Sequence, residues 1–323
     1  MCKGDILFMS IYSIFTKQGG MNLIKQYWKS GALFTAISEF LILGKEKKAL
    51  EILRLSAAYK TKRKLEKKYA SKLSNLEMEY DTSLVHKQSD KIWICWFQGI
   101  ENAPDIVKEC IDSIKENIPS KEVIIITEKN YSQYVNFPEY ILQKWKEGVI
   151  THTHMTDLLR LELLLKFGGT WIDATVLCTA KESEIPDYYF NSDLFLFQTL
   201  KPGRDGESTF ISSWYMSACT NNKILWLTRE LLYEYWKNNN FMIDYFLLHD
   251  FLCIVLEHHE DEWKNIVPKD NATPHILLLR LFDLYKPELY EDIRKQTPFH
   301  KLSYKFTDEQ KQQMNTFYKF LFE

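Results

Sequence analysis

The sequence predicts an α/β protein in which a mostly parallel central sheet is flanked by helices and preceded by a helical N-terminal region. Between residues 91 and 178, short apolar runs alternate with segments of helical periodicity, which is the order of a parallel sheet with helical crossovers. Residues 1–80 contain no proline and show helical periodicity. A chain of 323 residues, 46% hydrophobic and 26% charged, suits one large or two small globular domains. We therefore divide it into a helical, basic region, 1–88, and an α/β domain, 89–323.

The helical region becomes strongly basic between residues 45 and 72. Eleven Lys and Arg residues stand there against three Glu, a net charge of +8 in a chain whose total is −2. The apolar residues that can share one stripe of this helix are Ala49, Ile52, Leu53, Ala57 and Leu65. A basic amphipathic helix suits an anionic membrane surface, and it equally suits a solvated helix packed on its own domain. Both interpretations stay open.

The elements of the α/β domain follow from local pattern. Residues 92–97 form an apolar run too short for a helix, and 122–127 are β-branched, so both predict buried strands. Pro104 opens a segment with apolar residues at helical spacing, which predicts the crossover helix between them. The remaining predicted strands are 170–178, 193–200 and 209–218, and the remaining predicted helices are 154–167, 223–237 and 244–258.

Composition excludes several classes of function. The net charge of −2 and a pI of about 6.5 argue against a general nucleic-acid-binding protein. Neither a G-x-G-x-x-G nor a Walker A sequence occurs, so dinucleotide and P-loop chemistry are unsupported. The six cysteines form no C-x-x-C pair, which argues against a structural zinc site and indicates a reducing compartment. No uncharged run reaches the ~18 residues that span a bilayer, so we expect a cytoplasmic protein.

One segment combines charge with burial. The helix 154–167 is apolar on almost every side, yet it carries Asp157 and Arg160 one turn apart. In the following strand, alternation places Trp171, Asp173 and Thr175 on one side. An isolated Asp-x-x-Arg is usually a local ion pair, but buried charges cost several kcal/mol unless other groups satisfy them. Carboxylates and a guanidinium in one pocket suit a divalent cation and a diphosphate.

These residues stand in the pattern T-D-x-x-R-x-x-x-L-x-x-x-G-G-x-W-x-D-A-T, residues 156–175. The pattern resembles the donor-site signature of GT-A glycosyltransferases of the mannosyl/galactosyl-transferase-like group, in the bacterial capsular polysaccharide synthesis branch. The resemblance covers about residues 90–306 and includes the segments 243–250 and 299–305. It implies a GT-A-type nucleotide-diphospho-sugar transferase fold for the α/β domain.

The resemblance also implies roles for single residues. Asp157 would hydrogen-bond donor-sugar hydroxyls, Arg160 would lie near the sugar and diphosphate, and Asp173 matches the first acid of the DxD motif, which binds the ribose and the metal. Thr175 stands where that motif has its second acid, so a Mn²⁺ or Mg²⁺ ion would be held weakly, with help from the nucleotide. His300 resembles the C-terminal metal-ligand histidine.

Four further site residues follow from the same resemblance. Lys301 would bind the diphosphate, Trp96 and Gln98 would lie near the base, and Asp244 resembles the acid that opens the acceptor-side helix. Without that context, Trp96 is more often a core residue and His300 a satisfied loop histidine.

The function implied is transfer of a hexose from a nucleotide-diphosphate sugar, a UDP-sugar, with retention, to a lipid-linked oligosaccharide in capsule or surface polysaccharide synthesis. It would act at the inner face of the plasma membrane, with residues 45–72 on the anionic surface and no nucleic acid as partner. An inactive nucleotide-sugar-binding or scaffold member and a sugar-phosphate transferase are the alternatives. The sequence does not determine the donor, the acceptor or the oligomeric state.

Overall fold

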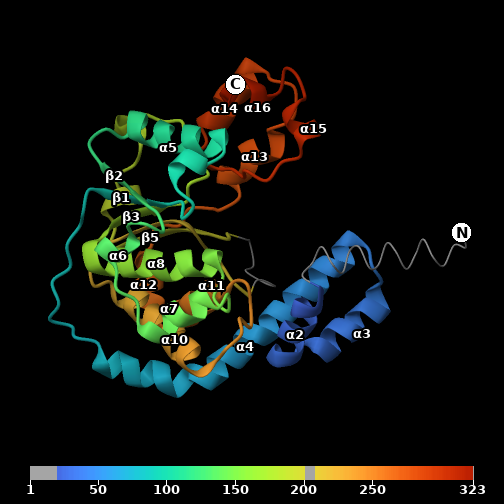
Figure 1. Cartoon of the computed structure of the whole chain (residues 1–323), viewed down its shortest axis with the longest axis vertical. Helices are drawn as coiled ribbons and strands as arrows, with labels where there is room; N and C mark the ends of the chain where they lie inside the picture. The colour runs from blue at the N-terminus through green and yellow to red at the C-terminus, as the bar shows by residue number, and fades with distance from the viewer. Residues whose placement is uncertain (1–19, 201–207, 323) are drawn as a thin grey trace, which may run out of the picture.

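The computed structural model describes residues 20–200 and 208–322, and Figure 1 shows their arrangement. The strands are β1 (Lys91–Cys95), β2 (Glu122–Ile126), β3 (Gly169–Ile172), β4 (Val176–Cys178), β5 (Leu194–Gln198), β6 (Ile211–Ala218) and β7 (Phe299–Lys301). The longer helices are α2 (Gly20–Ser30), α3 (Leu33–Leu43), α4 (Lys47–Glu79), α5 (Asp105–Asn117), α7 (Glu139–Lys146), α8 (His152–Phe167), α10 (Lys223–Asn238), α11 (Leu247–His258) and α14 (Pro287–Arg294). The shorter ones are α6 (Tyr131–Tyr134), α9 (Tyr188–Asn191), α12 (Glu260–Asn265), α13 (Ile276–Arg280), α15 (Asp308–Lys311) and α16 (Phe317–Phe322), with 3₁₀ turns η1 (Ile100–Asn102), η2 (Glu182–Glu184) and η3 (Thr273–His275).

The central sheet has the strand order β2-β1-β3-β6-β5. β2, β1 and β3 are parallel, while β6 is antiparallel to both of its neighbours, β3 and β5. Four strands therefore run in one direction and β6 runs against them. This mixed α/β architecture confirms the predicted fold class at that level.

The predicted strand 170–178 is wrong as one continuous element. β3 ends at Ile172, a turn covers 173–175, and β4 pairs antiparallel with β7 in a separate two-stranded sheet. Hydrogen bonds explain the break: the Asp173 amide still reaches the Trp214 carbonyl of β6, but the Val176 amide turns back to the Asp173 carbonyl. The apolar alternation continues through the turn, so a pattern of period two cannot reveal it.

The hydrophobic core lies on both faces of the sheet. Along β1, Trp93 belongs to the cluster shared with α8, α10 and α11, whereas Ile92 and Ile94 belong to the cluster shared with α5 and the C-terminal helices. In Figure 1 these two sets of helices lie on opposite sides of the strands. The sheet is thus buried on both faces, as nearly continuous apolar strands require.

Two glycines make the tight junction between α8 and β3. Gly168 has φ +65° and Gly169 has φ +95°, a region that side chains with a Cβ rarely adopt. A Cβ on Gly169 would lie 2.4 Å from the Lys91 carbonyl oxygen, so the close approach to β1 needs glycine. Gly168 follows directly after α8, where the predicted helix 154–167 also ends, and its amide donates to the Leu164 carbonyl.

The N-terminal helices meet the α/β domain through α4, which packs against α10 and α11. The residues that α4 buries are Ala49, Ala57, Thr61, Lys62, Leu65, Tyr69, Leu73 and Leu76. Ile52, placed on the apolar stripe by sequence, is 48% exposed, and the basic Lys62 is buried instead, where its ammonium pairs with Glu257. In the described ranges, no helix has the length and apolar character needed to cross a membrane. The division at residue 88 stays a prediction.

Candidate active site

The predicted site residues meet where parallel strands end. β1 and β3 are parallel and in register at Trp93 and Trp171, so the segments that follow both strands emerge at the same edge of the sheet. Asp173 directly follows β3, and Trp96 directly follows β1. Ligands of open α/β sheets bind outside this edge.

A cluster of two carboxylates and two cations forms there. The Arg160 Nη2 lies 3.3 Å from Asp157 Oδ1 and 3.6 Å from Asp173 Oδ1. On the other side, Lys301 Nζ lies 3.3 Å from Asp173 Oδ2 and donates a 2.6 Å hydrogen bond to Thr175 Oγ1. The two negative and two positive charges balance one another, which lowers the cost of burying them in the protein.

Arg160 is held from several directions at once. Its Nη1 donates to both the carbonyl and the hydroxyl of Ser213 on β6, each at 2.5 Å. Its guanidinium carbon lies 4.9 Å from the centre of the Trp171 ring, and Trp171 Nε1 donates to Asp173 Oδ1 at 3.0 Å. Because these contacts leave Nη2 aimed at the carboxylates, the guanidinium is fixed before any ligand arrives.

Asp157 is oriented by a second chain of hydrogen bonds. Trp236 Nε1 can only donate, and it donates to His154 Nε2 at 2.9 Å. The proton of His154 must then be on Nδ1, which lies 3.2 Å from Asp157 Oδ2 and donates to it. Burial alone would raise the pKa of Asp157, but Arg160 and this hydrogen bond outweigh burial and hold the pKa below its ordinary value. Asp157 is therefore an anion at neutral pH.

His249 is a site residue to which sequence reasoning assigned no role. It lies on α11, close enough to Asp157, Arg160 and Asp173 for their charges to affect its pKa. Burial lowers the pKa of His249 to about 4, so the ring is neutral near pH 7. Its Nδ1 is buried and has no hydrogen-bond partner among the described residues. One signal in the sequence was available: His249 stands in an apolar helix within the segment 243–250 that carries part of the resemblance.

His300 does not join this cluster. Neighbouring residues of a strand point to opposite faces, and Lys301 is the residue of β7 that reaches Asp173 and Thr175. His300 is fully buried, and its Nε2 hydrogen-bonds Thr179 Oγ1 at 3.0 Å. Burial lowers its pKa to about 4.

The residues present do not fit a preformed metal site. Within 20–200 and 208–322, no three His, Cys, Asp or Glu side chains lie together as a metal-binding group. Asp173 already pairs with two cations, and the Thr175 hydroxyl accepts a hydrogen bond from the Lys301 ammonium. The protein's own cations therefore occupy the neighbourhood that the predicted ligand set gave to Mn²⁺ or Mg²⁺.

The remaining predicted residues lie around the cluster in different ways. Trp96 is half-buried and contacts the Tyr304 ring at 5.2 Å, and its Nε1 has no partner in the described part of the chain. Gln98 is exposed in the turn that follows β1. Asp244 does not open a helix, because α11 begins at Leu247; it lies in the preceding loop and accepts from the Phe246 amide at 2.8 Å.

Asp244 belongs to a different neighbourhood. Burial raises the pKa of Asp250 well above its ordinary value, and the negative charge of Asp244 raises it further. Burial and then Asp244 also raise the pKa of Tyr27 on α2. Asp244 thus lies close enough to Tyr27 of α2 and Asp250 of α11 for its charge to affect both.

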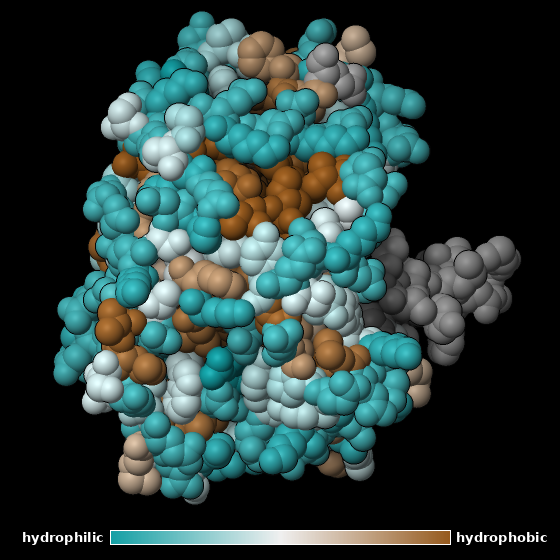
Figure 2. Space-filling model, turned by 60° about the vertical axis from the view of Figure 1, so that its left-hand side comes forward, coloured by the Kyte–Doolittle hydropathy of each residue, from teal (hydrophilic) through white to brown (hydrophobic). Residues whose placement is uncertain are grey.

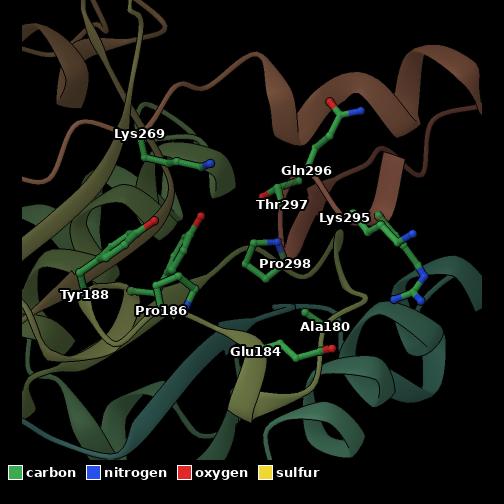
Figure 3. A pocket seen from close by; sticks show the side chains of 11 residues that line it. Ala180, Glu184, Pro186, Tyr188, Lys269, Lys295, Gln296, Thr297 and Pro298 are labelled. Carbon is green, nitrogen blue, oxygen red and sulfur yellow. The ribbon is translucent and has the colours of Figure 1, made fainter. Parts of the chain in front are cut away.

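The cavity drawn in Figure 3, of about 290 Å³, is separate from this cluster. It lies at the other end of the β4–β7 pair, next to Pro298, whereas Lys301 and Thr175 lie at the end near Asp173. Figure 3 shows Tyr188 and Lys269 on one side of it and Lys295 and Gln296 on the other. None of the predicted site residues lines it, so the chemistry is assigned to the charge cluster.

Comparisons with known proteins find two glycosyltransferases. An O-glycosyltransferase from Annulohypoxylon truncatum, "O-glycosyltransferase braB", is 34% identical over 96 residues, 27% of this chain and 23% of that protein. The chain thus matches about a quarter of that relative's length. The structure of "PaToxG Glycosyltransferase" aligns over 80% of this chain and 95% of its own, at 16% identity and a TM-score of 0.37, too low to support an argument.

The comparison with protein families covers far more of the chain. Residues 44–321 match the family described as "Capsular polysaccharide synthesis protein". This range contains α4, the whole central sheet and every residue of the charge cluster. The chain therefore belongs to the capsular polysaccharide synthesis protein family.

Proposed function

We propose that the protein is a glycosyltransferase that moves a hexose from a nucleotide-diphosphate sugar, a UDP-sugar, to a lipid-linked oligosaccharide during polysaccharide synthesis. The observation that carries the proposal is the pair of cations, Arg160 and Lys301, that flank Asp173 at the carboxyl ends of β1 and β3. Family membership and the relative named as an O-glycosyltransferase support the same class of reaction.

The cations suit the charge that develops in glycosyl transfer. When the bond between the anomeric carbon and the diphosphate breaks, negative charge grows on the phosphate oxygens, and fixed donors stabilise it most when they need no reorganisation. The contacts of Arg160 with Ser213 and Trp171 supply that fixation. Lys301 has a flexible stem, so it can move from the Asp173 carboxylate to a phosphate oxygen.

Asp157 and His249 suit the sugar. Asp157 is an oriented carboxylate and accepts hydrogen bonds, while the neutral His249 ring has one nitrogen without a partner in the described structure. Sugar hydroxyls both donate and accept, so the two groups can together select one pattern of hydroxyls.

We further propose retention of the anomeric configuration. An inverting transferase needs a carboxylate that can remove the acceptor proton, with a pKa near the working pH. Both carboxylates of the cluster are held in ion pairs with cations, and Asp157 has a lowered pKa. Neither is a good general base.

A lipid-linked acceptor implies work at a membrane surface, as we also propose. Exposed basic residues along α4 suit an anionic surface; they are Lys47, Lys48, Arg54, Lys60, Arg63, Lys64, Lys67 and Lys68. The Mn²⁺ or Mg²⁺ requirement stays a prediction, and no step depends on it here.

The experiment is a screen of UDP- and GDP-sugars for hydrolysis and transfer, with and without Mn²⁺. Asp173→Asn should lower transfer by at least about a hundredfold while the fold survives, because it removes the charge that positions both cations. Asp112→Asn is the matched control, since Asp112 is an exposed acid on α5 that pairs with Lys115 at 2.9 Å.

Three outcomes would overturn parts of the proposal. Full transfer by Asp173→Asn would remove the site assignment. Binding of a nucleotide sugar without turnover would favour the inactive, scaffold alternative. A product that carries both sugar and phosphate would identify a sugar-phosphate transferase.

A further inference from the structure

The hairpin of α2 and α3 exposes an unusual amount of apolar surface. Of the 22 large hydrophobic side chains that are exposed among the described residues, nine lie in these two helices: Met21, Ile24, Trp28, Phe34, Ile37, Phe40, Leu41, Ile42 and Leu43. Phe34, Leu41 and Ile42 are each at least 77% exposed. Scattered exposed hydrophobic residues are normal, but a cluster of this density marks an interaction surface.

The apolar side chains lie on defined sides of both helices. On α2, Met21, Ile24 and Trp28 stand at i, i+3 and i+7, and therefore share one stripe. On α3, Phe34 and Leu41 stand seven residues apart, two turns along one side. A Schellman turn at Gly31 joins the helices: the Ala32 amide donates to the Tyr27 carbonyl and the Gly31 amide to the Trp28 carbonyl.

Basic side chains flank the apolar ones. Lys25 and Lys29 are exposed on α2, and Lys47 and Lys48 are exposed at the start of α4, directly after α3. In the described part of α2 and α3 the single acid is Glu39, which is half-buried. Exposed Trp, Phe and Leu beside Lys are typical of helices that lie in the interface of an anionic bilayer. A protein partner would need no such positive border.

The hairpin also packs on the loop that precedes α11. Gln26 Nε2 of α2 donates to the Met242 carbonyl at 3.2 Å, and Lys29 lies 5.1 Å from the centre of the Phe241 ring. The same loop continues to the exposed Tyr245 and Phe246, and Phe246 contacts the His249 ring at 5.2 Å. Figure 1 shows α2 and α3 projecting from the rest of the protein, beside α4.

We propose that the α2–α3 hairpin inserts its apolar side chains into the interface of an anionic bilayer, with the flanking lysines on the lipid headgroups. This anchoring differs from an electrostatic contact of residues 45–72, since it buries hydrocarbon and so resists salt. It concerns the surface alone and does not depend on the transferase proposal. Figure 2, another view of the molecule, shows a hydrophobic hollow in the upper half and several smaller hydrophobic patches among hydrophilic residues.

The test is flotation of the full chain with vesicles of phosphatidylcholine and phosphatidylglycerol. We expect binding at low salt, and retention of most of it at about 1 M NaCl, where the Debye length falls to about 3 Å. The double variant Phe34→Ser/Leu41→Ser should bind at least about tenfold more weakly at both salt concentrations, because two exposed anchors are lost. Leu279→Ser is the control, as Leu279 is 78% exposed outside the hairpin.

Each other result would overturn the proposal. Complete release of the wild type at high salt would leave a purely electrostatic contact. Loss of binding on deletion of residues 1–19 alone would move the anchor out of α2 and α3. A wild-type dimer in light scattering, lost in the double variant without any vesicle binding, would identify a second copy as the partner. Transfer to a soluble acceptor should stay within twofold of wild type throughout, which separates failure of this proposal from failure of the transferase assignment.

Discussion

Helices α8 and α4 both bury a cation, and they bury it in opposite ways. Arg160 of α8 contacts two carboxylates, a ring, a carbonyl and a hydroxyl, and its side chain is 6% exposed. Lys62 of α4 is 7% exposed; it approaches the Phe210 ring, and its one charged partner is Glu257, whose side chain is 42% exposed and remains in water. A buried cation whose one charged partner is solvated forms a structural ion pair. A buried cation with several converging partners is held in place and is preorganised to bind a ligand.

The contrast separates the charges that could act on a ligand from those that hold helices together. The partners of Arg160 come from β3 and the turn that follows it, from β6 and from the same helix, so three parts of the fold fix one guanidinium. In α4 the ion pair of Lys62 reaches only α11. Two buried cations on helices therefore predict different consequences of mutation.

Within this comparison of α8 and α4, the largest effect is expected for Arg160→Lys. Lysine keeps the charge but lacks the planar fork that meets Ser213 and two carboxylates together, so kcat should fall about a hundredfold. The thermal midpoint should fall by a few degrees only. Steady-state kinetics with the identified donor measure the first effect and calorimetric melting the second. Wild-type kcat in this variant would show that fixation of the guanidinium is unimportant.

The position of this site was largely predictable from sequence, because two rules determine it. Helical spacing placed Asp157 and Arg160 on one side of α8, and strand alternation placed Trp171 and Asp173 together, as the hydrogen bond between them confirms. What alternation could not reveal is the turn after Ile172, where apolar residues continue although the strand has ended.

The role expected for His300 shows where the sequence was insufficient. His300 and Lys301 are adjacent in a strand, so only one of them can reach Asp173, and nothing in the local pattern says which. His249 needed tertiary information, since its position near Asp157 comes from the packing of α11 on β6 and α10, and the two residues are far apart in sequence.

A second prediction uses His300, a group buried without charge. Burial lowers its pKa from the ordinary 6.5 to about 4, so the unfolded chain binds a proton more readily than the native one between these values. Stability should therefore fall as the pH falls below 6.5, by about 2 kcal/mol at pH 5 from this group. Denaturant unfolding at pH 7 and pH 5 measures the slope.

The variant His300→Gln separates this contribution from those of other groups. It should lose that share of the pH dependence, although its stability at pH 7 is lower because Thr179 loses a partner. An unchanged slope in this variant would mean that His300 is not the group that titrates.

A third prediction asks whether the charge cluster accepts a cation before nucleotide binds. Arg160 and Lys301 already neutralise the carboxylates, so Mn²⁺ should bind the free protein weakly and bind better with UDP present. Thr175→Asp should tighten Mn²⁺ binding to the free protein about tenfold, because it adds a carboxylate that can bind the positive ion through oxygen. Calorimetry with and without UDP measures both. Tight binding of Mn²⁺ to the wild type without UDP would contradict the charge balance.

The smallest effect is expected for Lys62→Met, which tests the other half of the comparison. Methionine fills a similar volume next to the Phe210 ring, which the Lys62 ammonium approaches to 5.4 Å. The Glu257 carboxylate is partly exposed, so it stays hydrated when its partner is removed. Burial raises the pKa of Asp250 well above its ordinary value, so Asp250 stays protonated without Lys62. The free energy of unfolding should change by less than about 1 kcal/mol, and transfer activity by less than twofold.

Arg63→Met is the control, because Arg63 is exposed on the same turn. A loss above about 3 kcal/mol would show that Lys62 is as constrained as Arg160, and that partner number does not distinguish the two helices.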